Sequence, residues 1–439
     1  MSVRWQVFRG LAVAVALVGV ASGSAAAGAQ GQSAACPKLA ASGAWYGDNA
    51  ARLQGVIDAA GTCSGTPGGR RPLAVFDWDN TVIKNDISDQ TLFWMLRHDE
   101  LLQPPRRDWS TQSRYMTRAG AAALRRACGT SAKPGEPLRT SGSSARAVRC
   151  ADEVLSVREE GETSGGKPVF AGYDHRRMEA SYAWMAQLMR GRTPGQSRAI
   201  ARSARRAALR APVGATWRVG SEPKTAWIRY YPQIRDLVRT LKAAGFDPWV
   251  VSASPEEWAD VWGAEIGIDA EHTIGIRTVH RGGRITAHLR GCGPVPDGED
   301  SIMTYIDGKR CAINDRILGI RGAAALQPAP APLRQVIAGG DADTDVTMVR
   351  DATGAHLVLN RNKPELLCRA FANQDGRWVV NPMFIQPFGR FADGYPCATE
   401  GATNGAGKQV PVLGDDGVTP IPDQPDRVFA PGATASDAD

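Results

Sequence analysis

Residues 73–81 read Leu-Ala-Val-Phe-Asp-Trp-Asp-Asn-Thr, and this stretch decides the fold. Its four apolar residues at 73–76 have the length and composition of a buried strand. Two carboxylates, Asp77 and Asp79, follow directly and are separated by one residue. Such a pair at a strand end can divide two tasks, because one carboxylate can attack an electrophile while the other exchanges a proton. The stretch therefore predicts a strand that ends in a reactive loop.

Three further apolar runs lie downstream of the first. They cover residues 248–251, 336–338 and 355–359, and amphipathic helical patterns lie between the runs, for example at 231–244. Strands that alternate with helices predict an open parallel sheet. The expected fold class is therefore α/β with a Rossmann-like parallel sheet core, which binds its ligands at the carboxyl ends of the strands.

Polar groups stand close to these strands. Ser252 ends the run at 248–251, where its hydroxyl can donate a hydrogen bond to a phosphate oxygen. Lys309, in Asp-Gly-Lys-Arg, can neutralise charge that builds up on a phosphoryl group. The loop Gly-Asp-Ala-Asp-Thr-Asp at 340–345 offers the hard oxygen ligands that Mg²⁺ prefers. These groups together indicate phosphoryl chemistry assisted by a metal ion.

In this order, the four segments resemble the signature of the haloacid dehalogenase superfamily of phosphohydrolases. The pattern is D-x-D-x-T, a strand-end serine, a lysine and G-D-x-x-x-D, and residues 73–90 and 225–365 carry it. Four motifs in the right order are far more specific than a lone D-x-D-x-T. The resemblance implies an enzyme, a phosphoric monoester hydrolase, that works through an aspartyl-phosphate intermediate.

The resemblance also assigns catalytic roles to individual residues. Asp77 is expected to be the nucleophile, and Asp79 the general acid and base. Ser252 and Lys309 are expected to bind the phosphoryl oxygens. Dehalogenases of the superfamily lack an acid at the position of Asp79, because a departing halide needs no proton, whereas an alkoxide does. The presence of this acid therefore favours phosphate esters as substrates.

A magnesium site is implied by the same resemblance. The expected ligands are the carboxylate of Asp77, the backbone carbonyl of Asp79 and the carboxylate of Asp341. Thr81 is expected to support the first loop, and Asp345 to orient the lysine or a metal-bound water from a second layer of contacts. The cofactor predicted is therefore Mg²⁺.

A long insertion separates the first motif from Ser252, and residues 176–211 within it carry helical patterning. The phosphoserine phosphatase branch of the superfamily has a helical cap at this place, so we assign residues 95–224 to a cap. The hydrolase core then comprises residues 71–94 and 225–375. A cap closes over the substrate, excludes water and selects the leaving group.

The pattern as a whole is most similar to secreted, capped members of the superfamily that hydrolyse phosphorylcholine. The resemblance therefore implies a small amine phosphate such as phosphocholine. Asp86 and Asp89 are candidates for binding the cationic leaving group, with Trp78 as an aromatic wall. Each acid could instead cap a helix, and the tryptophan could belong to the core. The alternative is a broad scavenging range that includes nucleotides and sugar phosphates.

The beginning of the chain predicts export. Two arginines precede an apolar run at 11–21 that is too short to span a bilayer, and Ala-Gly-Ala at 27–29 is a cleavage site of the A-x-A kind. Residues 1–29 are therefore expected to be a cleaved signal peptide, followed by a leader at 30–70. This predicts a secreted or periplasmic protein without a stable membrane anchor.

Eight cysteines agree with export, because an even number in an oxidising compartment indicates disulfide bonds. Their order suggests four sequence-local pairs: Cys36–Cys63, Cys128–Cys150, Cys292–Cys311 and Cys368–Cys397. Residues 376–399 are expected to form a C-terminal extension. Residues 400–439 are rich in Gly, Pro, Asp and Thr without periodicity, which predicts a disordered tail.

The net charge of +7 over 439 residues is too modest to indicate a nucleic-acid partner. The resemblance implies that the partner is a small phosphate ester. One basic helical face repeats every four residues and is either a solvated surface or an attractor of anions: Arg198, Arg202, Arg206 and Arg210. A secreted anion-binding protein with a vestigial site would use this face, but the intact motifs argue against it. Asp343 has no assigned role, and the oligomeric state stays open.

Overall fold

The computed structural model of the chain describes residues 36–40, 43–62 and 70–430. The predicted signal peptide at 1–29 lies outside these residues, as does part of the predicted leader. Among the described helices, none combines the length and the apolar character that crossing a bilayer requires.

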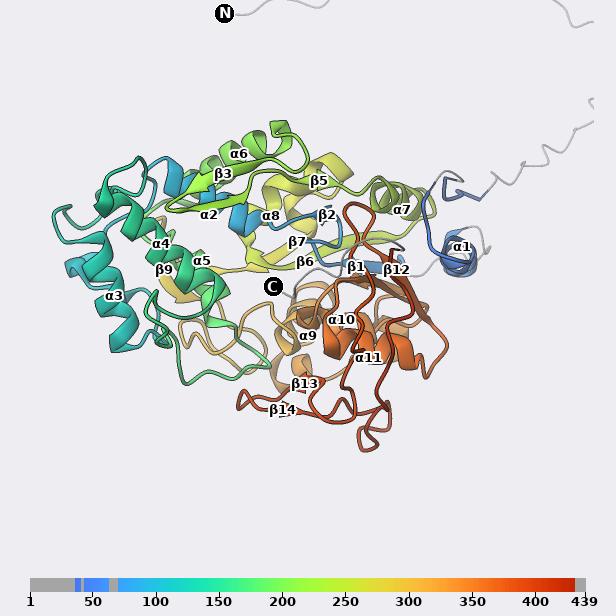
Figure 1. Cartoon of the computed structure of the whole chain (residues 1–439). Helices are drawn as coiled ribbons and strands as arrows, with labels where there is room; N and C mark the ends of the chain where they lie inside the picture. The colour runs from blue at the N-terminus through green and yellow to red at the C-terminus, as the bar shows by residue number, and fades with distance from the viewer. Residues whose placement is uncertain (1–35, 41–42, 63–69, 431–439) are drawn as a thin grey trace, which may run out of the picture. The chain divides into compact units, whose positions relative to one another are not determined.

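A six-stranded parallel sheet forms the core of the described residues (Figure 1), with the strand order β12-β11-β10-β1-β6-β7. Every neighbouring pair of strands in it is parallel. The strands are β1 (Leu73–Phe76), β6 (Asp247–Pro255), β7 (Thr273–Ile276), β10 (Ile337–Gly340), β11 (Ala355–Asn360) and β12 (Trp378–Pro382). The prediction of an α/β fold with a Rossmann-like parallel sheet is confirmed.

The order of the strands reverses at β1. The chain leaves β1 for β6 and β7 on one side, and returns later to β10, β11 and β12 on the other. Open parallel sheets bind ligands at the carboxyl ends of the strands where the order reverses, since the connecting loops part there. The carboxyl ends of β1 and β10 are therefore the expected place of the active site.

Helices cover both faces of the sheet, and β1 shows why. Successive side chains of a strand point to opposite faces. Ala74 and Phe76 pack in one apolar cluster with α1 (Asn49–Ala60) and α7 (Pro232–Ala243). Leu73 and Val75 pack in another cluster, with three further helices: α9 (Asp307–Ala312), α10 (Val346–Arg350) and α11 (Pro364–Ala372). A strand buried on both faces reads as a continuous apolar run, as residues 73–76 do.

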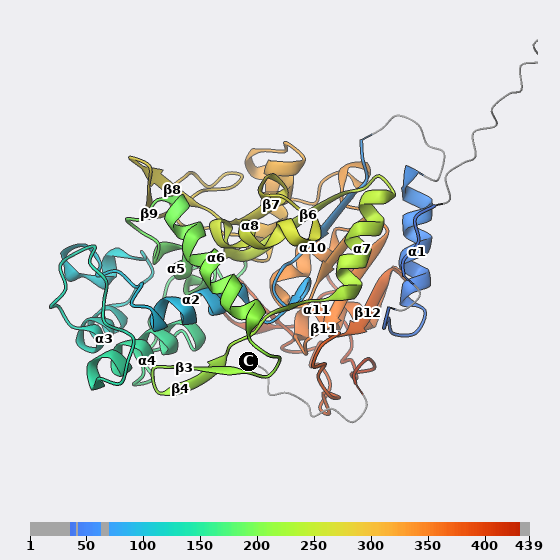
Figure 2. The ribbon, with the colours of Figure 1, turned by 90° about the horizontal axis from the view of Figure 1, so that it is seen from above.

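Residues 85–228, here called the insertion, connect β2 (Ile83–Lys84) to β5 (Arg229–Tyr230). Figures 1 and 2 show its helices α3, α4 and α5 gathered at one side of the sheet. The elements are α2 (Ile87–Arg97), α3 (Arg118–Cys128), α4 (Ala145–Glu159), α5 (Ala180–Gln187), α6 (Pro194–Arg210), β3 (Thr216–Val219) and β4 (Glu222–Thr225). The predicted cap at 95–224 falls within the insertion.

The apolar cluster of the insertion also includes side chains from beyond it. Ile285 and Leu289 of β9 (Arg284–Leu289) are buried among the residues of α2, α4 and α5. β9 pairs with β8 (Thr278–Arg281) in a hairpin that follows β7. Because these contacts join segments far apart in the sequence, helical patterning alone did not indicate them.

The prediction of a disordered tail at 400–439 is wrong for residues 400–430. This segment forms the short antiparallel pair β13 (Ala402–Thr403) and β14 (Gln409–Val410). Three of its apolar side chains are buried in the cluster beneath the sheet: Val412, Ile421 and Val428. These residues are too widely spaced to give a helical or strand period, so composition dominated the prediction. Residues 431–439 lie outside the described part of the chain.

Three of the four predicted disulfide bonds are present: Cys128–Cys150, Cys292–Cys311 and Cys368–Cys397. Cys63, of the fourth predicted pair, lies outside the described residues. The three bonds confirm the prediction of sequence-local pairs. Disulfide bonds of this kind are typical of exported proteins, because the cytosol keeps thiols reduced.

The disulfide bond that joins α3 to α4 is expected to stabilise the folded chain. Cys128 and Cys150 are buried and close a loop with a sequence separation of 22 residues. We expect the double variant Cys128→Ser/Cys150→Ser to lose about 3 kcal/mol of unfolding free energy, because the open chain gains conformational entropy when it unfolds. Urea unfolding followed by circular dichroism measures this loss. An unchanged midpoint would contradict the bond.

Candidate active site

The four motif segments meet at the carboxyl edge of the sheet. Asp77 follows β1, Ser252 lies in β6, and Asp341 follows β10. The backbone N–H of Asp77 donates to the carbonyl of Gly339 at 2.9 Å, so the first motif continues the pairing of β1 with β10. Lys309 reaches the same place from the first turn of α9.

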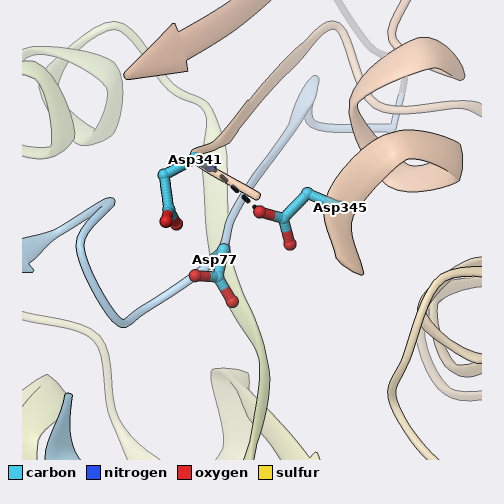
Figure 3. A group of neighbouring side chains, drawn as sticks. All are labelled: Asp77, Asp341 and Asp345. Atoms are coloured by element: carbon cyan, nitrogen blue, oxygen red, sulfur yellow. Dashed lines mark hydrogen bonds between the residues drawn. The ribbon is translucent and has the colours of Figure 1, made fainter. Parts of the chain in front are cut away.

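Asp77, Asp341 and Asp345 bring three carboxylates together in the centre of the site (Figure 3). One oxygen of each lies within 4.8 Å of the others, and all three side chains are buried. Burial raises the pKa of Asp77 and of Asp341, and the neighbouring charge of Asp345 adds to both shifts. Anionic oxygen ligands at this spacing fit the predicted Mg²⁺, which takes hard oxygen donors.

Lys309 supplies a fixed positive charge to the carboxylates. Its side chain is fully buried and donates hydrogen bonds to Asp77 and Asp345. Burial acts to lower the pKa of Lys309, but the carboxylates of Asp345 and Asp77 outweigh burial, so the pKa lies above its usual value. One ammonium balances only part of the charge of three carboxylates, which leaves a site that attracts a divalent cation.

Hydrogen bonds fix the loop after β10. The Oδ2 atom of Asp345 accepts the backbone N–H groups of Asp341 and Ala342 at 3.0 and 3.1 Å. Thr81 donates from Oγ1 to Oδ1 of Asp341 at 2.8 Å. A Cβ on Gly340 would lie 2.6 Å from the Cβ of Asp345, so only glycine permits this tight turn. Thr81 and Asp345 thus contact Asp341 and its loop, and the supporting roles expected of them stay predictions.

Asp79 is held at both of its carboxylate oxygens. Oδ1 accepts the backbone N–H of Ile87 at 2.7 Å, and Oδ2 accepts the hydroxyl of Ser254 at 2.7 Å. Burial raises the pKa of Asp79 well above its usual value, and the charges of Asp86 and Asp77 raise it further. A carboxyl group that holds its proton more tightly is suited to protonate a leaving group.

Ser252 lies deeper than its predicted role suggests. It is fully buried and does not line the pocket, whereas Ser254 on the same strand does. The hydroxyl oxygen of Ser252 accepts the backbone N–H of Ser254 at 3.1 Å. This contact uses a lone pair and leaves the hydroxyl hydrogen available, so donation to a phosphoryl oxygen stays a prediction.

A pocket of about 40 Å³ lies in front of the carboxylates, between the sheet and the insertion. The sheet side contributes Asp77, Asp79, Ala253, Ser254, Asp341, Ala342, Thr344 and Arg361. The insertion contributes Asp86, Ser88, Arg158, Tyr182 and Met185. Side chains of the sheet and of the insertion thus line one pocket in front of the proposed nucleophile.

Arg158 stands where a cationic leaving group was expected. Its Nη2 atom lies 2.9 Å from Oδ1 of Asp89 and 3.9 Å from Oδ2 of Asp86. Asp86 also caps α2, since its Oδ1 accepts the backbone N–H groups of Ser88 and Asp89. Asp89 does not line the pocket, so the structure separates the two acids: Asp86 faces the pocket, and Asp89 pairs with arginine.

The prediction of Trp78 as an aromatic wall is wrong. Trp78 is fully buried in the core and packs edge-on against Tyr230, with ring centroids 6.2 Å apart. Along an extended loop, neighbouring side chains point to opposite sides, so Trp78 turns away from the side on which its neighbours lie. The aromatic ring that lines the pocket is that of Tyr182, and the guanidinium of Arg158 lies 4.4 Å from its centroid.

Arg361 is a site residue that sequence reasoning missed. It follows β11 directly, as Asp341 follows β10, and its Nη1 atom lies 3.3 Å from Oδ2 of Asp341. Its position after the apolar run at 355–359 was the available signal. Asp343, by contrast, accepts the backbone N–H of Leu366 at 2.9 Å and so supports the start of α11.

Comparisons with known proteins agree with this site. Residues 167–350 match the family described as haloacid dehalogenase-like hydrolase. No curated protein matches the chain. A conserved, functionally unknown protein from Anaerococcus prevotii DSM 20548 is similar in structure, with a TM-score of 0.55 and 18% identity over 77% of this chain and 92% of that one. A substrate-bound phosphoserine phosphatase complex gives a TM-score of 0.31 and 13% identity, over 66% and 87%. The family match covers residues 167–350 and agrees, over that part of the chain, with the prediction of a haloacid dehalogenase-type hydrolase.

Proposed function

We propose that this chain is a magnesium-dependent phosphomonoesterase that works through an aspartyl-phosphate intermediate. Its match to the haloacid dehalogenase-like hydrolase family over residues 167–350 supports the proposal. The observation that carries this proposal is the buried cluster of Asp77, Asp341 and Asp345 around Lys309. Asp79, the proposed proton donor, lies beside the cluster and is held by its own contacts. A nucleophile, a cation site and an acid are the parts that phosphate ester hydrolysis needs.

In the proposed reaction, a carboxylate oxygen of Asp77 attacks phosphorus, and the bond from phosphorus to the ester oxygen breaks. Asp79 gives its proton to the departing alkoxide. Water then attacks the aspartyl phosphate, Asp79 takes a proton from this water, and phosphate leaves with Asp77 restored. Mg²⁺ bound by Asp77, Asp341 and the carbonyl of Asp79 would offset the negative charge of the carboxylates and the phosphoryl group.

Positive side chains would hold the phosphoryl group in place. Lys309 already contacts Asp77, so an oxygen of the transferred group would come within its reach. Ser252 is proposed to donate its hydroxyl hydrogen to the same group. Arg361 would add a second positive charge, since its guanidinium lines the pocket beside Asp341. Charges fixed before the reaction stabilise a phosphoryl transition state without reorganisation.

For the leaving group we propose a small amine phosphate such as phosphocholine, with Asp86 as the acid that faces it. Asp86 lines the pocket, and the resemblance to phosphorylcholine hydrolases supports this choice. Two observations favour the broader scavenging range instead. Arg158 already partly neutralises the acids, and no tryptophan lines the pocket. Secretion is part of the proposal, and the three disulfide bonds support it.

Substrate preference separates these two possibilities. We expect Asp86→Ala to lower kcat/KM for phosphocholine about tenfold relative to p-nitrophenyl phosphate, because a lost charge contact costs about 1–3 kcal/mol. Asp89→Ala is the matched control, since Asp89 pairs with Arg158 but does not itself line the pocket, and it should change both esters equally. If Asp86→Ala leaves the ratio of kcat/KM for the two esters unchanged, the result favours the broad scavenging range.

The proposed function itself is tested by turnover. The purified chain should release p-nitrophenol from p-nitrophenyl phosphate in the presence of Mg²⁺. Failure to hydrolyse any member of a panel of phosphate monoesters would refute it and favour the vestigial anion-binding protein.

A further inference from the structure

Two serines connect the proposed general acid to the base of the insertion. Ser88 Oγ donates to Ser254 Oγ at 2.7 Å, and Ser254 Oγ donates to Asp79 Oδ2 at 2.7 Å. Ser254 gives its one hydrogen to Asp79 Oδ2, and a lone pair of that oxygen accepts it whether or not the carboxyl group also carries a proton. Ser254 is then free to accept the hydrogen of Ser88.

Burial makes these contacts strong. Ser254 is 2% exposed and Ser88 is 4% exposed, yet both line the pocket in front of Asp77. Shielding from water strengthens hydrogen bonds, because the effective dielectric constant around buried groups is low. The chain therefore fixes the orientation of the Asp79 carboxyl group with respect to the pocket.

The other oxygen of Asp79 is held from the same helix. Oδ1 accepts the backbone N–H of Ile87, which is the first residue of α2, and Ser88 is the second. α2 leads the chain from the sheet into the insertion. Both oxygens of Asp79 thus depend on the N-terminal turn of α2, one directly and one through Ser254 of β6.

We propose that Ser254, supported by Ser88, is a positioning residue that aims Asp79 at the ester oxygen of the substrate. The inference rests on the proposed phosphomonoesterase function. In the step concerned, the bond from phosphorus to the ester oxygen breaks, and the proton of Asp79 forms the new O–H bond. Ser254 keeps its own hydrogen throughout. Each Asp79 oxygen has a second lone pair beyond these contacts, so one of them can carry the proton that is transferred.

This arrangement also makes proton transfer depend on the position of the insertion. A movement of α2 away from the sheet separates Ser88 from Ser254 and Ile87 from Asp79. The acid is then aimed only while the first turn of α2 keeps both contacts, as it does in this structure.

The test compares two esters that differ in their need for an acid. An alkyl phosphate leaves as a strongly basic alkoxide and needs a proton, whereas 2,4-dinitrophenyl phosphate leaves as a stable phenolate. The quantity to measure is kcat/KM, since it covers only the steps up to formation of the phosphoenzyme and omits its later hydrolysis. The variants are Ser254→Ala, Ser254→Thr and Ser88→Ala.

We expect Ser254→Ala to lower kcat/KM for the alkyl phosphate about 10–100-fold, the lower range of what general acid catalysis contributes. The value for 2,4-dinitrophenyl phosphate should change by less than about threefold, since that ester does not draw on the acid. Ser254→Thr keeps the hydroxyl and should retain the activity of the wild type on both esters. Ser88→Ala should act in the same direction as Ser254→Ala, with a smaller loss.

Equal losses for both esters would overturn the inference, since that result means general damage to the site. No loss for either ester would overturn it as well. If Ser254→Ala fails to fold, as judged by its urea midpoint, the selective loss in Ser88→Ala decides the question by the same criterion. A wild type that hydrolyses neither ester refutes the phosphomonoesterase function itself, so the two failures are distinguishable.

Discussion

Asp77→Asn is expected to abolish hydrolysis of every phosphate ester while the fold stays intact. The amide has nearly the size of the carboxylate but cannot attack phosphorus, so no aspartyl phosphate forms. Loss of a catalytic nucleophile costs about 10³-fold or more in kcat. Lys309 keeps Asp345 as a partner in the variant, so its charge stays compensated and the urea midpoint should change little. Initial rates with p-nitrophenyl phosphate and urea unfolding measure the two effects.

The matched control is Asp343→Asn, in the loop after β10. Asp343 lies two positions from Asp341, but its carboxylate contacts the start of α11 and does not line the pocket. Activity of this control should stay within about threefold of the wild type, since the substitution touches no reacting group. A turnover by Asp77→Asn within tenfold of the wild type would contradict a nucleophilic role for this residue.

Asp341→Ala is expected to remove both Mg²⁺ binding and activity. The substitution deletes an anionic ligand from a buried cluster, and the remaining carboxylates cannot form the same oxygen cage. Titration calorimetry with Mg²⁺ should show binding to the wild type and none to the variant. EDTA should likewise stop the wild type, and excess Mg²⁺ should restore it, because the ion offsets the charge of the transferred group.

Thr81→Val gives a graded control for the metal site. It leaves the carboxylate of Asp341 in place and removes the hydroxyl that donates to Asp341 at 2.8 Å and, more weakly, to Asp77 at 3.5 Å. Removal of such an orienting partner weakens metal affinity by about 10–100-fold, so this variant should regain activity at high Mg²⁺. Full activity of the wild type in metal-free buffer would contradict the metal site altogether.

Much of the fold could be predicted because its central strands are buried on both faces. Residues 73–76 are a continuous apolar run, residues 355–359 are apolar except for His356, and the structure has β1 and β11 there. β7 and β12, at the two edges of the sheet, were missed. β7 is a four-residue strand with a glycine, and β12 ends in Asn-Pro, so neither reads as an uninterrupted apolar run. Strand pairing, which depends on contacts far apart in the sequence, fixes these elements.

The core of the site was predictable for a related reason. Asp77 and Asp341 follow adjacent parallel strands, so their side chains had to meet at one edge of the sheet. The contacts on the side of the pocket that the insertion forms could not be predicted from the order of the strands. Arg158 pairs with Asp89 across α2 and α4 of the insertion, and no local pattern places these helices against each other.

Ser254 marks the limit of motif reasoning within one strand. Ser252 and Ser254 are two residues apart on β6, where the pairing of β6 with β7 is irregular. The motif pattern predicts Ser252 as the site residue. In the structure, however, Ser254 lines the pocket and donates a hydrogen bond to Asp79. Only the depth of each residue in the fold distinguishes them, and depth follows from packing that the sequence does not state.

Chemical trapping of the covalent intermediate tests the role of Asp77 most directly. Enzyme turning over p-nitrophenyl phosphate with Mg²⁺ is quenched in acid and reduced with borohydride, which converts an aspartyl phosphate to homoserine. Peptide mass spectrometry then locates the homoserine. We predict it at position 77, only in samples that contained substrate, and nowhere in Asp77→Asn. Homoserine at another aspartate, or none during steady turnover, would contradict an aspartyl phosphate on Asp77.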